Sequence, residues 1–195
     1  MNLPNKLTIS RLVLTFFFLL VMFSEMRYHE TVALVLFAAG GITDLLDGKI
    51  ARRYKLITNF GILMDPLADK ILVCSAFIAF VGNQWVSAWM VVVVVARELA
   101  ITGLRMLAAS KSVVLAAERY GKHKTVSQIV AIIALLVTAS YRDWGVVGKI
   151  FGITIAGRPW SEYFTQAALY LAVALTFISG AIYLWKNRRI YMDDM

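Results

Sequence analysis

The chain has 195 residues, of which 60% are hydrophobic and 16% are charged. It is too apolar for a soluble globular domain and too short for two domains, so we expect one membrane-embedded domain over residues 1–195. The formal net charge is +8, but the Lys and Arg residues form short clusters between apolar segments. This pattern speaks against a nucleic-acid partner and favours membrane lipids and phosphorylated ligands.

Apolar stretches long enough to cross a bilayer follow one another along the chain, and each such helix takes about 20 residues. They cover about residues 9–27, 31–52, 60–81, 85–109, 125–141 and 163–186. Ahead of them, Pro4 favours a first helical turn, and Leu3, Leu7 and Ile9 can face lipid, which predicts a short interfacial helix over about 1–10. The sequence therefore predicts an all-α integral membrane protein with six transmembrane helices.

Basic residues flank alternate ends of these predicted spans unequally. One side holds Lys6, Arg11, Lys49, Arg52, Arg53, Lys55, Lys111, Arg119, Lys122, Lys124, Lys186, Arg188 and Arg189, and the other holds Arg27, Arg142, Lys149 and Arg158. Because Lys and Arg concentrate on the cytoplasmic side of a membrane, we expect both termini to face the cytoplasm. An aromatic belt is expected at the opposite interface, formed by Trp85, Trp89, Tyr141, Trp144 and Trp160.

Two aspartates lie within each of the second and third predicted spans. Asp44 and Asp47 are three residues apart, and Asp65 and Asp69 are four apart, so each pair projects from one face of its helix. With a rise of 1.5 Å per residue, Asp47 and Asp65 each lie on the order of 10 Å from the basic loop at 53–59 that joins the helices. The four carboxylates can therefore meet in one layer near the cytoplasmic end.

Carboxylates at this depth need compensation, since an aspartate at the centre of a span costs about 2.5–3.5 kcal/mol on insertion scales. Salt bridges to Lys49, Arg52 or Lys70 are one solution, and divalent cations that bridge the carboxylates are the other. Four carboxylates at paired helical spacing favour cations, and an all-oxygen ligand set suits Mg²⁺, Mn²⁺ or Ca²⁺ rather than zinc. Gly48 and Gly61 flank this layer, where their spacing fits helix packing and ligand approach equally well.

These residues form one pattern with fixed spacing. It reads Asp44-x2-Asp47-Gly48-x2-Ala51-Arg52-x8-Gly61-x3-Asp65-x3-Asp69. The pattern resembles the signature of the CDP-alcohol phosphotransferase family at every defined position. The resemblance to bacterial members extends to residues 4–11, 65–70, 96–98, 103–105 and 121–125, and fades after about residue 145.

The resemblance implies a six-helix homodimer in the bacterial cytoplasmic (inner) membrane, with a polar cavity open to the cytoplasm. It implies that Asp44, Asp47 and Asp65 bind two Mg²⁺ or Mn²⁺ ions, and that Asp69 is a general base that also contacts metal. It implies that the CDP-diacylglycerol pocket is lined by Gly48, Ala51, Arg52 and Gly61. Asn5, Thr8 and Arg11 can cover this pocket from the interfacial helix, or serve as a helix cap and a membrane anchor.

The implied reaction transfers a phosphatidyl group from CDP-diacylglycerol to a small alcohol. We expect sn-glycerol 3-phosphate as the acceptor, because basic residues that can bind its phosphate occur in and after the fourth span. The predicted acceptor residues are Arg97, Arg105, Lys122, Lys124 and Thr125. Arg97 and Arg105 are expected to be buried, with Glu98 able to pair with one of them. Lys122 and Lys124 are expected nearer bulk water, and Thr125 can also cap the fifth span.

Two alternatives remain open from the sequence. The first keeps the chemistry and changes the acceptor to phosphatidylglycerol, serine or an inositol phosphate; an acceptor without a phosphate leaves Arg97 and Arg105 unexplained. The second is a divalent-cation transporter, because intramembrane carboxylates also mark ion pathways. A transporter is expected to bind metal near the membrane midplane, whereas these carboxylates are predicted near the cytoplasmic end, beside Arg52.

Overall fold

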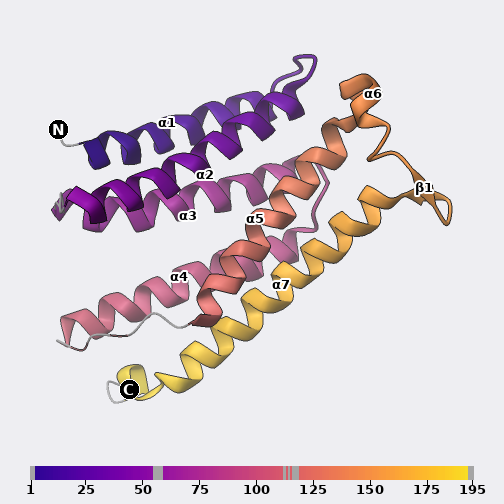
Figure 1. Ribbon diagram of the computed structural model, residues 1–195. Helices are drawn as coiled ribbons and strands as arrows, with labels where there is room; N and C mark the ends of the chain where they lie inside the picture. Colours follow the sequence, from indigo (N-terminus) through magenta and orange to yellow (C-terminus); the bar gives the residue numbers. More distant parts are fainter. Residues whose placement is uncertain (1–2, 55–58, 112, 114, 116–118, 193–195) are drawn as a thin grey trace.

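The computed structural model describes residues 3–54, 59–111, 113, 115 and 119–192. Within these ranges, the side chains at 3–5, 7, 44–54, 59–63, 65–66, 69 and 119–122 lie outside the described part. The long helices of the described ranges are α1 (Leu3–Met22), α2 (His29–Tyr54), α3 (Asn59–Gly82), α4 (Ala88–Ser110), α5 (Arg119–Ser140) and α7 (Trp160–Lys186). Figure 1 shows them as an elongated bundle.

Short elements join and end the long helices. The 3₁₀ helix η1 (Tyr141–Trp144) and α6 (Gly145–Gly148) follow α5, strands β1 (Thr154–Ile155) and β2 (Arg158–Pro159) precede α7, and α8 (Arg189–Met192) follows it. The two strands pair antiparallel, with Ile155 opposite Arg158. Ala156 and Gly157 between them both have positive φ, of 51° and 87°, which matches the right-handed twist of a two-residue hairpin.

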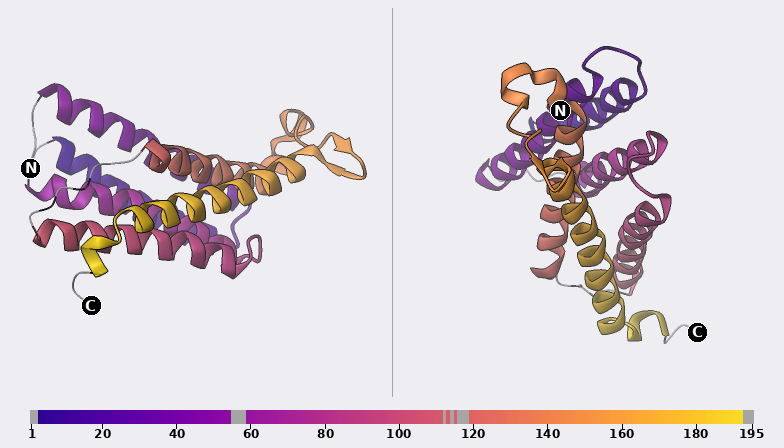
Figure 2. Two further views of the ribbon diagram at one scale, coloured as in Figure 1. Left: turned by 90° about the horizontal axis from the view of Figure 1, so that it is seen from below. Right: turned by 90° about the vertical axis from the view of Figure 1, so that its right-hand side faces the viewer.

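The long helices alternate in direction, so their ends gather at two opposite ends of the bundle (Figures 1 and 2). One end, here called the termini end, holds the start of α1, the end of α2, the start of α3, the end of α4, the start of α5 and the end of α7. The other, the hairpin end, holds the turn between α1 and α2, the turn between α3 and α4, and the β-hairpin. α1 packs on α2 and α3, and α7 packs on α5 and α4.

The buried charged side chains of the described part gather in one half of the bundle, whereas apolar and uncharged polar side chains are buried in both halves. The main hydrophobic core lies in the hairpin half and includes Phe18, Phe37, Phe77, Phe80 and Leu136. Buried polar side chains of the termini half are Thr8, Arg11, Glu98, Lys124, Gln128, Thr176 and Ser179. Because buried polar groups are costly unless they are paired or serve a ligand, the termini half is the place to look for a site.

The predicted spans correspond one to one to the long helices of the described ranges. The predicted interfacial helix does not stand apart: α1 runs unbroken from Leu3 to Met22, because Pro4 is tolerated in a first helical turn and no helix breaker follows it.

The six-span count is not confirmed. Among the described residues, two helices are long and apolar enough to cross a membrane, His123–Gly148 and Trp160–Lys186. Helix α4 fails this test because Arg97, Glu98 and Arg105 interrupt its apolar run.

The aromatic residues predicted to form a belt lie on segments at the hairpin end. Trp144 donates a hydrogen bond of 2.9 Å from Nε1 to Thr31 Oγ1, and Trp160 donates one of 2.7 Å to the carbonyl of Ile150. Phe151 contacts both rings: it is edge-on to Trp144, with centroids 5.7 Å apart, and stacked on Trp160, with centroids 6.1 Å apart. This group fastens the hairpin to the bundle.

Candidate active site

The four predicted carboxylates belong to two consecutive helices, in the halves of these helices that lie toward the termini end. Asp44 and Asp47 lie in the second half of α2, and Asp65 and Asp69 lie in the first half of α3. Their side chains lie outside the described part, as do those of Asn5, Gly48, Ala51, Arg52 and Gly61. The common carboxylate layer and the predicted roles of these residues therefore stay predictions.

Helix α1 brings two buried polar side chains to the same half of the bundle. Thr8 and Arg11 are both fully buried. The carbonyl of Arg11 accepts a hydrogen bond of 2.8 Å from Thr15 Oγ1. Arg11 is therefore buried in the polar half of the bundle. This burial argues against its alternative role as a membrane anchor at the surface. A guanidinium buried in a helical membrane bundle usually serves a partner or a ligand.

A polar contact joins α3 to α4 beside the last of the four aspartates. Lys70, which follows Asp69 in the chain, donates a hydrogen bond from Nζ to Thr102 Oγ1. Thr102 Oγ1 in turn donates to the carbonyl of Glu98 at 2.7 Å. The segment of α3 that carries Asp69 is therefore linked to α4 at Thr102, one turn after Glu98.

The central feature of the described part of the site is a cluster of three charged residues on two helices. Glu98 on α4 accepts hydrogen bonds at the same oxygen, Oε1, from Lys124 Nζ on α5 and from Arg97 Nη1 on α4, the latter at 3.4 Å. The side chains of Arg97, Glu98 and Lys124 are 13%, 7% and 5% exposed. Two cations from different helices therefore lie within reach of one point inside the bundle.

Arg97 makes few hydrogen bonds, and its aliphatic stem is closely packed. Among the described residues, its buried Nε has no hydrogen-bond partner, and its bond to Glu98 is long. Its aliphatic stem lies against Gly180 of α7: a Cβ built at Gly180 would come within 2.7 Å of Arg97 Cγ. The guanidinium therefore retains donor capacity that an anionic ligand could use.

A line of uncharged polar contacts joins α5 to α7 next to this cluster. Gln128 donates a hydrogen bond of 3.0 Å from Nε2 to Thr176 Oγ1. Thr176 Oγ1 donates to the carbonyl of Ala172 at 2.6 Å, and Ser179 Oγ donates to that of Thr176 at 3.1 Å. Gln128 and Thr176 are fully buried. These bonds fix the position of α7 relative to the helix that carries Lys124.

The structure separates the predicted acceptor residues. Arg97 and Lys124 come together, and the expectation that Lys124 lies near bulk water is wrong, since the residue is 4% exposed. The expectation that Arg105 is buried is also wrong. Arg105 is exposed, donates from Nε to Tyr183 Oη at 3.3 Å and lies 5.7 Å from the centroid of that ring. Because Arg105 lies eight residues after Arg97, its side chain projects in a different direction from α4, where it is more exposed.

The two remaining predicted acceptor residues lie near the start of α5. Helix α5 begins at Arg119, so Thr125 stands in its second turn and does not cap it. Thr125 is partly buried, and the side chain of Lys122 lies outside the described part. The expected pairing of Glu98 with one of the two arginines is confirmed for Arg97, whereas sequence reasoning did not place Lys70 or Gly180 in the acceptor site. An acidic residue inside an apolar run signals Glu98, whereas the importance of Gly180 is visible only through its contact with α4.

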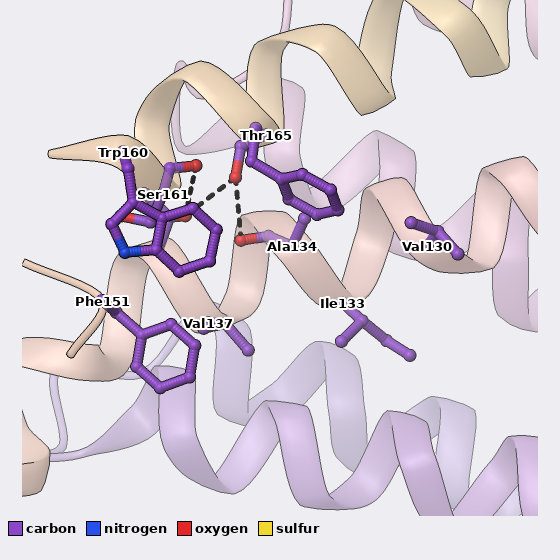
Figure 3. Close-up of a pocket in the computed structure, with 10 residues that line it drawn as sticks. Val130, Ile133, Ala134, Val137, Phe151, Trp160, Ser161 and Thr165 are labelled. Carbon is purple, nitrogen blue, oxygen red and sulfur yellow. Dashed lines mark hydrogen bonds between the residues drawn. The ribbon is translucent and has the colours of Figure 1, made fainter. Parts of the chain in front are cut away.

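A pocket of about 240 Å³ lies between α5 and α7 in the hairpin half (Figure 3). It is lined mainly by apolar side chains, among them Val130, Ile133 and Trp160, with Thr165 Oγ1 donating to the carbonyl of Ala134 at 3.1 Å. Its lining contains no charged side chain, and its rim residues belong to the opposite half from the charged cluster. The chemistry of a phosphorylated ligand therefore points to the termini half and not to this pocket.

With this arrangement established, comparison with known proteins identifies the family. A family model described as CDP-alcohol phosphatidyltransferase matches residues 1–180. The chain belongs to the CDP-alcohol phosphatidyltransferase family. The match extends well past residue 145, where the sequence resemblance was expected to fade.

Full-length relatives agree. The CDP-diacylglycerol–glycerol-3-phosphate 3-phosphatidyltransferase of Bacillus subtilis (strain 168) is 37% identical over 198 residues, covering 95% of this chain and 95% of the relative. Proteins of the same name from Escherichia coli (strain K12) and Sodalis glossinidius (strain morsitans) are each 33% identical. The first alignment covers 99% of this chain and 98% of the relative. The second covers 96% of each.

Family membership gives the aspartate segments a chemical reading. Four carboxylates supply only oxygen donors, which is the ligand type that Mg²⁺ and Mn²⁺ prefer. Two of these carboxylates belong to α2 and two to α3, and their binding of such a cation stays a prediction. The charged cluster of α4 and α5 lies in the same half of the bundle as these aspartate positions.

Proposed function

We propose that this protein transfers the phosphatidyl group of CDP-diacylglycerol to sn-glycerol 3-phosphate, giving phosphatidylglycerophosphate and CMP. Such a reaction provides the precursor of phosphatidylglycerol and cardiolipin. The observation that carries the proposal is nearly full-length similarity to phosphatidyltransferases whose names state this donor and this acceptor. The buried pair of cations, Arg97 and Lys124, supports an acceptor that carries a phosphate.

The donor half of the site is assigned to α1, α2 and α3. Asp44, Asp47 and Asp65 hold the divalent cations in this proposal, and Asp69 acts as general base and as a further ligand. When bound, Mg²⁺ or Mn²⁺ supplies positive charge beside the pyrophosphate of the donor. The nucleotide pocket is assigned to the remaining residues of the motif and of α1: Asn5, Thr8, Gly48, Ala51, Arg52 and Gly61.

The acceptor half is assigned to α4 and α5. Arg97 and Lys124 bind the phosphate of glycerol 3-phosphate, with Lys122, Thr125 and Arg105 in outer positions. The link from Lys70 through Thr102 to Glu98 holds this half against the segment that carries Asp69. A hydroxyl presented there meets a carboxylate that can take its proton, and the oxygen then attacks the donor phosphorus directly as CMP leaves.

The bundle is proposed to lie in the bacterial cytoplasmic membrane as a six-span homodimer with both termini and the active site on the cytoplasmic side. The two helices that are long and apolar enough to span support membrane insertion. The alternating direction of the long helices of the described ranges supports a topology with both ends of the bundle's chain on one side, which the distribution of basic residues also predicts.

An acceptor panel tests the function. Purified enzyme in detergent micelles receives CDP-diacylglycerol, Mg²⁺ and one acceptor at a time: glycerol 3-phosphate, glycerol, serine, an inositol phosphate or phosphatidylglycerol. CMP release and the lipid product are measured together. We expect phosphatidylglycerophosphate with glycerol 3-phosphate and at most slow release with the others. A preference for a phosphate-free acceptor refutes the acceptor assignment, and metal flux into proteoliposomes without CMP release refutes the enzyme assignment.

A further inference from the structure

Arg97 owes its position to two residues that the family motif does not contain. Glu98 supplies a carboxylate that draws Arg97 and Lys124 together, and Gly180 leaves the space that the Arg97 stem occupies. We infer that Glu98 and Gly180 are positioning residues for the acceptor, which hold the Arg97 guanidinium where it meets the acceptor phosphate. This inference rests on the proposed function, because it assigns the phosphate of the acceptor to Arg97.

The space at Gly180 is the most restrictive contact around Arg97. A Cβ at this position would lie 2.7 Å from Arg97 Cγ and 3.6 Å from Arg97 Cβ. Cγ belongs to the stem next to the backbone and not to the mobile end of the side chain, so it cannot swing aside without a change of rotamer. Gly180 is itself buried. Any side chain at position 180 therefore displaces the guanidinium or pushes α7 away from α4.

Electrostatics restricts Arg97 from the other side. Glu98 is the one residue of the described part that is hydrogen-bonded to both Arg97 and Lys124. Like charges so deeply buried repel each other unless an anion lies between them. Without the carboxylate, the two cations would be expected to separate before the acceptor arrives, and binding would have to bring them back together. Glu98 thus holds Arg97 and Lys124 close together before the acceptor phosphate binds.

A hydrogen bond joins α7 to α5 one turn before Gly180. Thr176 and Ser179, just before Gly180, bond to backbone carbonyls of their own helix, and Thr176 is tied to Gln128 of α5. The same bonds that hold α7 on α5 therefore fix Gly180 relative to Lys124. Arg97, Lys124 and Gly180 come from three different helices, so their mutual position depends on the packing of the bundle.

Gly180→Ala is the decisive variant, because alanine has the higher helix propensity and adds a single methyl group. The kinetic constants for glycerol 3-phosphate and for CDP-diacylglycerol are measured separately through CMP release. Displacing a binding group by about 1 Å can cost up to about a hundredfold, so we expect kcat/KM for glycerol 3-phosphate to fall at least about tenfold. The KM for CDP-diacylglycerol should stay unchanged.

The same substitution in an Arg97→Ala background separates positioning from a general structural effect. If Gly180 acts through Arg97, adding Gly180→Ala to Arg97→Ala should change the acceptor constants by less than about twofold. Gly103→Ala is the matched control, since a Cβ at this helical glycine of α4 meets nothing within 4 Å. It should match the wild type. Glu98→Gln is expected to raise the KM for glycerol 3-phosphate in the wild-type background and less in the Arg97→Ala background.

The inference is overturned by wild-type acceptor constants in Gly180→Ala, by an undiminished effect in the Arg97→Ala background, or by an equal effect of Gly103→Ala. Loss of affinity for both substrates in parallel would do the same, because it indicates a general loss of structure. If the wild type itself does not use glycerol 3-phosphate, the proposed function fails. If the wild type uses it and Gly180→Ala is silent, this inference alone fails.

Discussion

Arg97→Ala should weaken the use of glycerol 3-phosphate far more than Arg105→Ala. The Arg97 side chain is 13% exposed and lies beside Glu98, and its Nε donates no hydrogen bond to a described residue. Loss of a hydrogen bond to a charged group costs about 1.5–3 kcal/mol, which corresponds to roughly a ten- to 150-fold rise in the acceptor concentration needed. Arg105 is exposed and lies over Tyr183, where a charge contributes about 0–1 kcal/mol, or less than about fivefold.

The assay titrates glycerol 3-phosphate at saturating CDP-diacylglycerol and follows CMP, and a second titration varies the donor. Arg97→Lys should recover only part of the loss, because an ammonium cannot reproduce the bidentate fork of a guanidinium. Arg105→Ala is the matched control on the same helix. Equal effects of the two alanine variants, or an unchanged acceptor dependence in Arg97→Ala, would refute the assignment of the phosphate to Arg97.

Three further predictions concern the aspartates. Exhaustive chelation should abolish CMP release and added Mg²⁺ or Mn²⁺ should restore it, since clustered carboxylates repel one another without a counter-charge; full turnover without divalent cations contradicts this. Asp44→Asn, Asp47→Asn and Asp65→Asn should each abolish metal-dependent turnover, while the protein keeps its helical circular dichroism and its elution volume. A wild-type rate in one of these variants would show that the residue is not part of the site. Asp69→Asn should still bind CDP-diacylglycerol and metal but transfer poorly; loss of donor affinity would make Asp69 mainly a ligand.

The helices were predictable from the sequence, and their ends and rotations were not. Long apolar runs predict helices in a membrane, and each predicted span overlaps one long helix of the described ranges. The segment between α5 and α7 gave no periodic signal, so η1, α6 and the hairpin were not expected. Their positions depend on contacts such as the hydrogen bond from Trp144 to Thr31, which joins residues far apart in the chain.

Burial of single side chains was the least predictable property of the site. Arg97 and Arg105 have similar surroundings in the sequence, yet α7 covers the first through Gly180 and leaves the second exposed. Which face of α4 meets α7 is decided by packing between helices and not by the local sequence. The aspartate pattern, by contrast, is local, because residues three or four apart share a helix face wherever that face points.

Lys124 shows how a misjudged burial changes an energetic prediction. Loss of a lysine side chain at the membrane surface would change the stability little. In the structure, however, Lys124 is 4% exposed and hydrogen-bonded to buried Glu98. Removing one partner of a buried ion pair costs about 3–5 kcal/mol, while replacing both by uncharged residues can be nearly neutral. Lys124→Met should therefore lower the thermal unfolding temperature in detergent clearly, and the double variant with Glu98→Gln should recover much of it. Lys149→Met, at an exposed site in the hairpin half, should behave as the wild type. If the double variant is as unstable as the two single losses added together, Glu98 and Lys124 do not stabilise each other, and the charged cluster loses its role as a unit.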